Sequence, residues 1–345
     1  MIGEKKSLNL QILSILRDHS DIKHPLSKQD IKRYLEEEYG QENIDGRTIT
    51  SNIDVLNEYL DDAIEYDTKE FKAKGSASER RYGYYLMRNF DESELRLIID
   101  SVLSSKSIPS NQSEQLIEKL QKEGSPNFKY KKNVIKKYTS GLKANEEMFT
   151  NIEVLGEAID EKKKVQFKYY DYDINKKWIP RLKSDGTEKI YTLTPLRMVV
   201  NNGRYYLFGA PDIHDDLAIF RIDKIKSAKV LDEPGKSKDK IAILRDGMDL
   251  GKHIAEHIFM NIGPSETVIF EFDKWWISFI VDWFGQDIEL KMKDENICVG
   301  RIRVNVQSFI NWLMMSSFAE IKVTSPKSVV DEIKERAKQI NKLYK

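Results

Sequence analysis

The stretch PLRMVVNNGRYYLFG, residues 195–209, sets the turn sequence NNG between two runs of strand-forming side chains. Asparagine and glycine tolerate the positive φ of tight turns, so this pattern predicts a β-hairpin. Side chains alternate between faces along a strand, which places Arg204, Tyr206 and Phe208 on one face and Tyr205 and Leu207 on the other. Packing alone and ligand binding are both compatible with this arginine and aromatic edge.

Further strand-like runs surround the hairpin. They cover residues 165–173, 188–200, 204–210 and 217–231, with turns at KSDGT, NNG and PDIHDD. Several short strands at this spacing predict a small β-barrel. Arg221 falls mid-strand between apolar neighbours, where an unpaired guanidinium is costly to bury. Arg221 should therefore face either an acid or an anionic ligand.

The first 90 residues predict helices followed by a hairpin. Apolar residues recur at helical spacing over residues 8–16, Ser27 is an N-cap signal for a second helix, and Asp45 can cap a third. The third helix carries one apolar stripe, made of Ile49, Ile53, Leu56 and Leu60. Two β-like runs follow, residues 63–71 and 80–87, joined by the small and polar KAKGSASE. This order is the outline of a winged helix-turn-helix.

The third helix and the hairpin hold the candidate DNA contacts. Arg47 and Ser51 lie opposite the apolar stripe, and Arg and Asn side chains can read base edges while Ser and Thr reach phosphates. Acidic side chains on the same helix, Asp54 and Glu58, support an alternative in which it is a protein-interaction helix. The DNA-binding candidates are Arg47, Thr48, Thr50, Ser51, Asn52, Lys72, Lys74, Arg80 and Arg81.

The formal net charge of the chain is zero, which argues against a protein that coats nucleic acid through its whole surface. Basic residues are concentrated in two islands instead. Residues 69–88 hold six basic residues against two acidic ones, and residues 122–143 hold seven lysines against one glutamate. The first island coincides with the predicted hairpin, where phosphates would pass.

Residues 91 to about 150 predict a helical connector with breaks at SIPSNQS and GSPNF. After the linker DEPGKSKDK, strand-like runs alternate with helical ones, from TVIFEFD and the Trp-rich KWWISFIVDWFG to a closing helix that starts at Pro326. This alternation predicts an α+β sandwich with helices on one face of an antiparallel sheet.

Signals for catalysis are weak. The segment HIAEH matches a pattern in which two histidines one helical turn apart bind zinc and a glutamate activates water. A zinc peptidase through His253, Glu256 and His257 is therefore a remote alternative to a solvated linker helix, and no third ligand can be identified. The sequence has no phosphate-binding loop of Walker type and no nucleophile elbow. We expect neither an enzyme nor a cofactor.

The single cysteine, Cys298, excludes an intramolecular disulfide and fits a reducing compartment. No window approaches about 18 consecutive apolar residues, and the N-terminus lacks the apolar region of a signal peptide. We therefore expect a cytoplasmic protein.

PLRMVVNNGRYYLFG followed by AIFRIDKIKSAKVL resembles the WYL-domain family of prokaryotic transcriptional regulators. The family's Trp-Tyr-Leu tripeptide corresponds to Tyr205-Tyr206-Leu207, so a tyrosine replaces the tryptophan, and Lys224 stands where the family has an arginine. DGRTITSNIDVLNEYL resembles the recognition helix of these regulators, with Ser51-Asn52 where they often carry Arg-Asp. Residues 309–344 resemble their C-terminal extension, which is called WCX.

The resemblance implies a DNA-binding transcriptional regulator, usually a homodimer, whose barrel senses a nucleic acid or nucleotide. Its partners would be an operator, palindromic if the dimer is two-fold symmetric, and an anionic effector. An alternative is a single-stranded nucleic-acid-binding accessory factor of a DNA repair or defence system. The motif carries over the ligand-binding positions Tyr169, Arg197, Arg204, Tyr205 and Arg221.

The expected fold is an α+β multidomain chain. We expect a winged helix-turn-helix over residues 1–90 and a helical connector over residues 91–150. A small Sm-like, SH3-like WYL barrel should follow over residues 151–235, and a linker with a ferredoxin-like WCX sandwich over residues 236–345.

Overall fold

The computed structural model describes residues 7–60, 63–73, 76–130, 145–214, 216–241, 251, 256–261, 263–316 and 320–345, without the side chains of residues 69–79 and 238. The chain separates into two compact units, Met1–Ser105 with Ser110–Gly141 and Lys106–Pro109 with Leu142–Lys345. Most of the second basic island, residues 131–143, lies outside the described residues. No helix in the described part of the chain is long and apolar enough to cross a membrane.

The N-terminal unit begins with the helices α1 (Leu8–His19), α2 (Lys28–Tyr39) and α3 (Gly46–Tyr59). At the start of α2, Ser27 and Asp30 form a reciprocal capping box, and Gly40 ends the helix at a φ of 65°. The Asp45 carboxylate accepts hydrogen bonds from the first turn of α3. These caps confirm the predicted helix starts. The helices share a core that includes Ile12, Leu16, Ile31, Leu35, Ile49 and Ile53.

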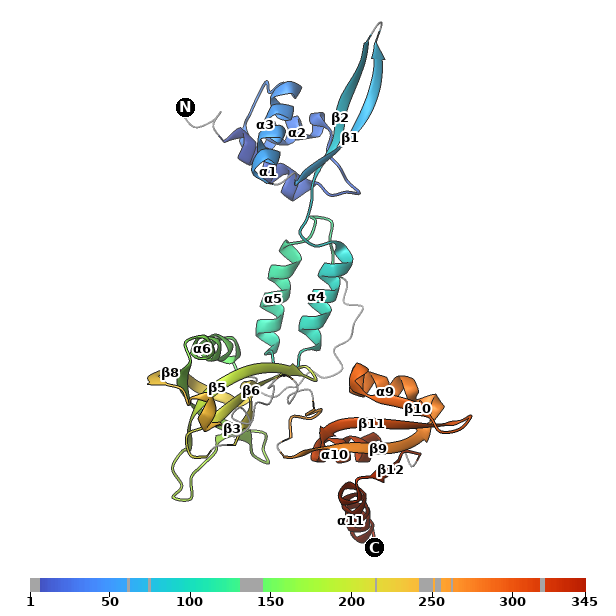
Figure 1. Cartoon of the computed structure of the whole chain (residues 1–345). Helices are drawn as coiled ribbons and strands as arrows, with labels where there is room; N and C mark the ends of the chain where they lie inside the picture. The colour runs from blue at the N-terminus through green and yellow to red at the C-terminus, as the bar shows by residue number, and fades with distance from the viewer. Residues whose placement is uncertain are drawn as a thin grey trace. The chain divides into compact units, whose positions relative to one another are not determined.

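An antiparallel hairpin of β1 (Ile64–Ala73) and β2 (Ser76–Leu86) follows these helices and extends beyond them in Figure 1. The strands pair as far as Ala73 with Ser76. They therefore continue through most of KAKGSASE, which was predicted to be the connecting loop. The prediction was wrong because strand formation depends strongly on cross-strand pairing, and the register of the hairpin pairs most of these small, polar residues with one another.

Two further helices in the described part of this unit are α4 (Glu92–Ser104) and α5 (Ser110–Lys122), which lie side by side in Figure 1. Asp91 and Glu94 form a capping box at the start of α4. The two helices share a small core of Leu95, Ile99, Ile117 and Phe128. The break predicted at GSPNF follows α5, whereas the one predicted at SIPSNQS is only partly a break, because its residues 110–113 form the first turn of α5. The two segments of the connector on either side of SIPSNQS are helical as expected.

The second unit contains a central sheet in the strand order β4-β3-β5-β6-β7, with β8 paired to β3. Between β5 and β6, Asn202 and Gly203 adopt φ values of 49° and 72°, as a tight two-residue hairpin turn requires. A 3-10 turn at Ile222–Lys224 divides the predicted run 217–231, and β4 was not predicted. The elements are α6 (Met148–Asp160), β3 (Lys163–Tyr172), β4 (Trp178–Pro180), β5 (Ile190–Asn201), β6 (Arg204–Pro211), β7 (Ala218–Arg221) and β8 (Ile225–Pro234).

A C-terminal sheet follows in the order β10-β11-β9-β12. Val268, Phe270 and Phe272 alternate along β9 and share one core with Ile280 of α9 and Trp312 of α10. Both helices therefore cover the same face of the sheet, as the alternation of elements predicts. The elements are β9 (Ser265–Asp273), α9 (Ile277–Phe284), β10 (Glu289–Met292), β11 (Ile297–Asn305), α10 (Val306–Ser316), β12 (Lys322–Ser325) and α11 (Lys327–Leu343).

Candidate functional site

Helix α3 presents an exposed face opposite its buried stripe. Ile49 and Ile53 are fully buried, which turns Arg47 and Ser51 to the solvent. Among the described residues, neither side chain has a hydrogen-bond or ion-pair partner. Asp45 holds this end of the helix, since its carboxylate accepts from Arg47 N and Thr48 N at 2.7 and 2.8 Å. These hydrogen bonds lower the pKa of Asp45, so it caps as an anion.

Thr50 and Asn52 use their side-chain donors within the helix. The Thr50 hydroxyl donates to Gly46 O at 2.9 Å, and Asn52 Nδ2 donates to Thr48 O at 2.8 Å. Asn52 would have to break this hydrogen bond to form a bidentate contact with adenine. Thr48 is half-buried beside them.

An open hollow of about 670 Å³ adjoins the exposed face of α3. Lys28 of α2 and Asp54, which were not predicted as site residues, both contribute to this surface. The hollow combines a basic side chain from each of two helices with hydroxyl groups, which suit a phosphate group. Its two carboxylates are already engaged, Asp45 in the cap of α3 and Asp54 with Arg81. Its lining residues are Lys28, Asp45, Gly46, Arg47, Thr50, Ser51 and Asp54.

The predicted DNA-binding residues of the hairpin have different surroundings in the structure. Arg81 forms an ion pair with Asp54 of α3, and its guanidinium lies 4.4 Å from the ring centre of Tyr66. The hydrogen bond to Asp54 raises the pKa of Arg81, which is thus committed to joining the hairpin to α3. Arg80 is exposed on β2. The side chain of Lys72 and the whole of Lys74 lie outside the described residues.

In the central sheet, Asp223 brings two of the predicted ligand residues together. Its carboxylate accepts from Arg221 Nη2 at 2.6 Å and from Arg204 Nη1 at 3.3 Å. Burial would lower the pKa of Arg221, but the hydrogen bonds and charge of Asp223 outweigh it and raise this pKa. Arg221 therefore faces an acid, which was one of the two predicted environments.

Tyr169 lies next to this ion pair and is buried. Its hydroxyl accepts from Arg221 N at 3.2 Å, and burial raises its pKa to about 12. The Arg181 guanidinium lies 4.7 Å from the centre of the Tyr169 ring. A cation over an aromatic face is attracted by the ring electrons. Because the Tyr169 side chain is buried, it supports the neighbouring cations more than it offers a surface of its own.

A second acid, Asp171, joins the cations on the other side of Tyr169. It accepts from Arg181 Nε at 2.6 Å and also pairs with Lys224. Burial would raise the pKa of Asp171, but hydrogen bonds from Lys224 and Arg181 keep it lowered. We call the set of Tyr169, Asp171, Arg181, Arg204, Arg221, Asp223 and Lys224 the barrel-edge cluster. It holds four cations against two carboxylates and is therefore net positive.

The other two predicted ligand residues lie apart from the barrel-edge cluster. Tyr205 packs against the apolar core of the sheet, and its N–H donates to Ser107 Oγ at 3.2 Å. Arg197 is exposed on β5 and pairs across the sheet with Phe208. Tyr206, which pairs directly with Arg221, is the aromatic residue on the face of the arginines. The alternation along RYYLFG already placed Tyr206 on the face of Arg204.

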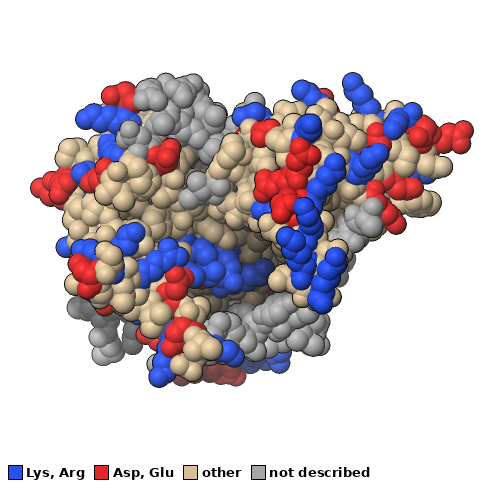
Figure 2. All heavy atoms as spheres, turned by 90° about the horizontal axis from the view of Figure 1, so that it is seen from below, with Lys and Arg blue, Asp and Glu red and all other residues tan. Residues whose placement is uncertain are grey.

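Charges of both signs are mixed on the surface, as the zero net charge suggests. On the face shown in Figure 2, Lys and Arg side chains are interspersed with Asp and Glu side chains. Four members of the barrel-edge cluster, Asp171, Arg181, Asp223 and Lys224, were not among the predicted ligand residues. Asp223 follows Arg221 by two residues, but its role depends on the 3-10 turn that returns it to the arginines.

The HIAEH segment is only partly described, because His253 lies outside the described residues. Glu256 and His257 are buried, and the Glu256 carboxylate accepts from Arg303 Nε at 3.1 Å. The described residues contain no group of three or more His, Cys, Asp or Glu side chains that could hold a metal ion.

Residues 150–230 match the family model of the WYL domain, so the resemblance noted in the sequence is confirmed for this part of the chain. Among solved structures, the chain is similar to the proteasome accessory factor B/C (PafBC) of Arthrobacter aurescens, with 11% sequence identity and a TM-score of 0.27. The similarity covers 95% of this chain and 47% of that chain, so this chain spans about half the length of that structure. A comparison with curated proteins gave no match.

Proposed function

We propose that the chain is a DNA-binding transcriptional regulator whose N-terminal helices and hairpin form a winged helix-turn-helix. The exposed face of α3 carries the proposal, because Arg47 and Ser51 stand unpaired, among the described residues, on a helix with a capped start and a buried back. A recognition helix reads base edges with such residues near its N-terminus. The WYL domain at residues 150–230 supports the same class of function.

In this proposal α3 enters the major groove and the hairpin follows the backbone. Arg47 makes the base or phosphate contact nearest the start of α3, and Thr48, Thr50, Ser51 and Asn52 complete the surface. Lys72, Lys74 and Arg80 lie on the hairpin side, where phosphates would pass. Arg81 acts through Asp54 by holding the hairpin against α3.

DNA binding can be tested with the purified chain and a labelled duplex from upstream of its own gene. At about 150 mM salt, fluorescence anisotropy should give tighter binding to this duplex than to a scrambled one. Arg47→Ala should lower this discrimination by about 1–3 kcal/mol. Arg301→Ala, in the C-terminal sheet, removes an exposed arginine as a matched control. Equal affinity for both duplexes would contradict the proposal.

We propose further that the barrel-edge cluster senses an anionic effector, a nucleotide or a short nucleic acid. Arginine forks and an aromatic face suit phosphates and bases. Arg204, Arg221 and Arg181 would contact the ligand, while Arg197 and Tyr205 would contact only a ligand that extends past the cluster.

The central sheet would be the Sm-like barrel of a WYL sensor, and the βαββαβ order of the C-terminal part favours a ferredoxin-like WCX domain.

In this proposal the regulator binds a palindromic operator as a homodimer, in the cytoplasm.

A second candidate function is the binding of single-stranded nucleic acid by an accessory factor, which the cations over the rings of Tyr169 and Tyr191 favour. Arg47→Ala combined with Asn52→Ala separates the two functions. A regulator loses operator discrimination in this variant, whereas an accessory factor keeps its affinity for a single-stranded oligonucleotide.

A further inference from the structure

A cavity of about 350 Å³ lies within the N-terminal unit, beside the junction between the end of β2 and α4. This volume falls in the range of small-molecule sites. The walls come from the loop after α1, the end of β2, α4 and the segment after α5. The walls carry six apolar side chains beside charged and polar ones, and the apolar ones are Ile22, Leu86, Met87, Phe90, Leu95 and Phe128.

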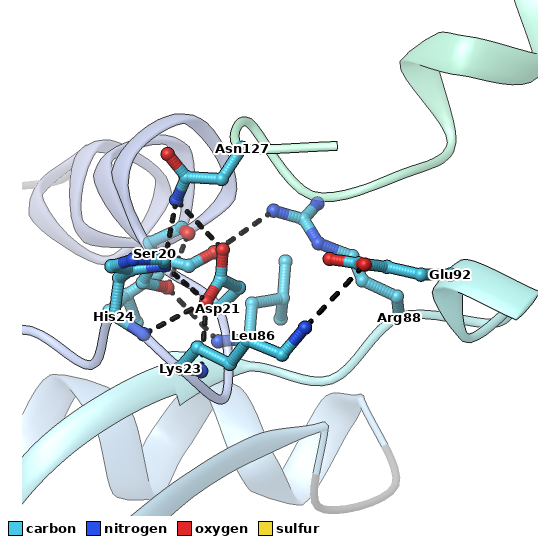
Figure 3. A network of polar contacts seen from close by, with 9 residues as sticks. Ser20, Asp21, Lys23, His24, Leu86, Arg88, Glu92 and Asn127 are labelled. Atoms are coloured by element: carbon cyan, nitrogen blue, oxygen red, sulfur yellow. Dashed lines mark hydrogen bonds and ion pairs between the residues drawn. The ribbon is translucent and has the colours of Figure 1, made fainter. Parts of the chain in front are cut away.

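The acidic residues on the walls are already engaged (Figure 3). The Asp21 carboxylate accepts from Asn127 Nδ2, Lys23 N and His24 N, each at 2.8 Å. Burial opposes its ionisation, but these hydrogen bonds outweigh it and lower the pKa of Asp21 to about 2. Glu92 pairs with Lys23 at 3.5 Å, and Asp91 caps α4. No carboxylate on the walls is left to neutralise a further cation.

Of the two cations on the walls, Lys23 pairs with Glu92, whereas Arg88 has no acidic hydrogen-bond partner among the described residues. Its Nη2 donates to Arg17 O and, at 3.4 Å, to Ser20 O, both of them neutral carbonyl groups. Its Nε is buried and has no hydrogen-bond partner among the described residues. Burial lowers the pKa of Arg88 and outweighs the attraction of Asp18, Asp21 and Glu123, none of which accepts a hydrogen bond from the guanidinium. A carboxylate placed directly against a partly buried guanidinium reduces the cost of that burial.

We propose that this cavity binds a small organic monocarboxylate, with its carboxylate on Arg88 and its apolar body among Leu86, Phe90 and Phe128. The site lies on other elements than the barrel-edge cluster, and it goes beyond the effector proposed above. Its walls belong both to the part proposed to bind DNA, through the loop after α1 and the end of β2, and to α4 and the segment after α5. If these elements can adopt more than one arrangement, a bound ligand favours the arrangement to which it binds most tightly.

The probe for the test is 1-naphthoate, titrated into the full chain in the absence of DNA by isothermal titration calorimetry. Its neutral analogue 1-naphthamide keeps the two rings and removes the charge. We expect saturable binding of one naphthoate per chain and at least about tenfold weaker binding of the amide, because hydrogen bonds between charged partners exceed neutral ones. Arg88→Leu should lower the naphthoate affinity by about tenfold.

Two further variants keep the test decisive. Arg96→Leu, on α4 but outside the cavity walls, makes the same change of charge and should leave the affinity unchanged. Met87→Trp should fill the cavity and weaken the binding of both probes while Arg88 keeps its contacts. This variant tests the site even if Arg88→Leu does not fold. Equal affinity for the two probes, no effect of Met87→Trp, or no saturable binding at all would overturn the proposal. Because DNA is absent, these outcomes are independent of the DNA-binding test.

Discussion

Replacing Asp223 with asparagine removes the carboxylate shared by Arg204 and Arg221 while it keeps the size of the side chain. The Asp223 side chain is 13% exposed, and those of Arg204 and Arg221 are 30% and 28% exposed. Breaking a buried ion pair costs about 3–5 kcal/mol, whereas an exposed pair contributes about 0–1 kcal/mol. The intermediate exposure of this cluster gives an expected loss of about 2 kcal/mol in unfolding free energy.

Calorimetry of the full chain measures this loss. For a unit of this size, about 2 kcal/mol lowers the Tm of the corresponding transition by about 4–8 °C. Asp232→Asn is the matched control, since its carboxylate pairs with Lys163 at 3.4 Å but is 99% exposed. A Tm for Asp223→Asn equal to that of the control would refute the reasoning. The same variant should bind a short oligonucleotide more tightly if the cluster is an anion site, because a competing carboxylate has been removed.

Three other changes follow from single contacts. The folded-state pKa of Asp21, about 2, lies below its ordinary value of 3.8. The ionised carboxylate therefore stabilises the fold above about pH 4, and this stabilisation is lost as the pH falls toward 2. Asp21→Asn should lower the unfolding free energy by about 2 kcal/mol at pH 7 in urea unfolding and should flatten this dependence on acid pH. Tyr169→Phe leaves Arg221 N without its acceptor and should cost about 1 kcal/mol in the same assay, whereas Tyr344→Phe, at an exposed hydroxyl, should not. Gly209→Ala places a Cβ 2.5 Å from Leu193 Cδ1 and 3.0 Å from Thr194 O, so thermal unfolding should show a loss of about 1–3 kcal/mol. The control Gly156→Ala meets only Met198 Cε at 3.8 Å and lies within helix α6, so its Tm should not fall and should rise slightly, since alanine favours a helix over glycine.

The features that sequence predicted well are local ones. The caps at Ser27 and Asp45 and the turn at Asn202 and Gly203 depend on residues within a few positions of each other, so their chemistry is readable in the chain. Alternation along β6 likewise placed Arg204 with Tyr206 and apart from Tyr205. The motif resemblance favoured Tyr205 as a ligand residue, whereas the strand geometry turns it toward the core.

The partners of the arginines could not be predicted, because they depend on which segments fold together. Arg81 pairs with Asp54 of α3 only because the hairpin packs on that helix. Lys224 reaches Asp171 through the pairing of β8 with β3 and the 3-10 turn that precedes β8. Residue spacing gives no signal for either contact.

Carboxylates already hold arginines at both candidate nucleic-acid surfaces, Arg81 by Asp54 and Arg204 with Arg221 by Asp223. A phosphate that takes over such an arginine frees a carboxylate, which then attracts a cation from solution. That uptake offsets part of the counterion release that normally makes nucleic-acid binding salt-dependent. A ligand gains most at the barrel edge if one phosphate satisfies Arg204 and Arg221 together, as Asp223 does. In the proposed sensor, the arrangement would therefore select for the geometry of the phosphate more than for total negative charge.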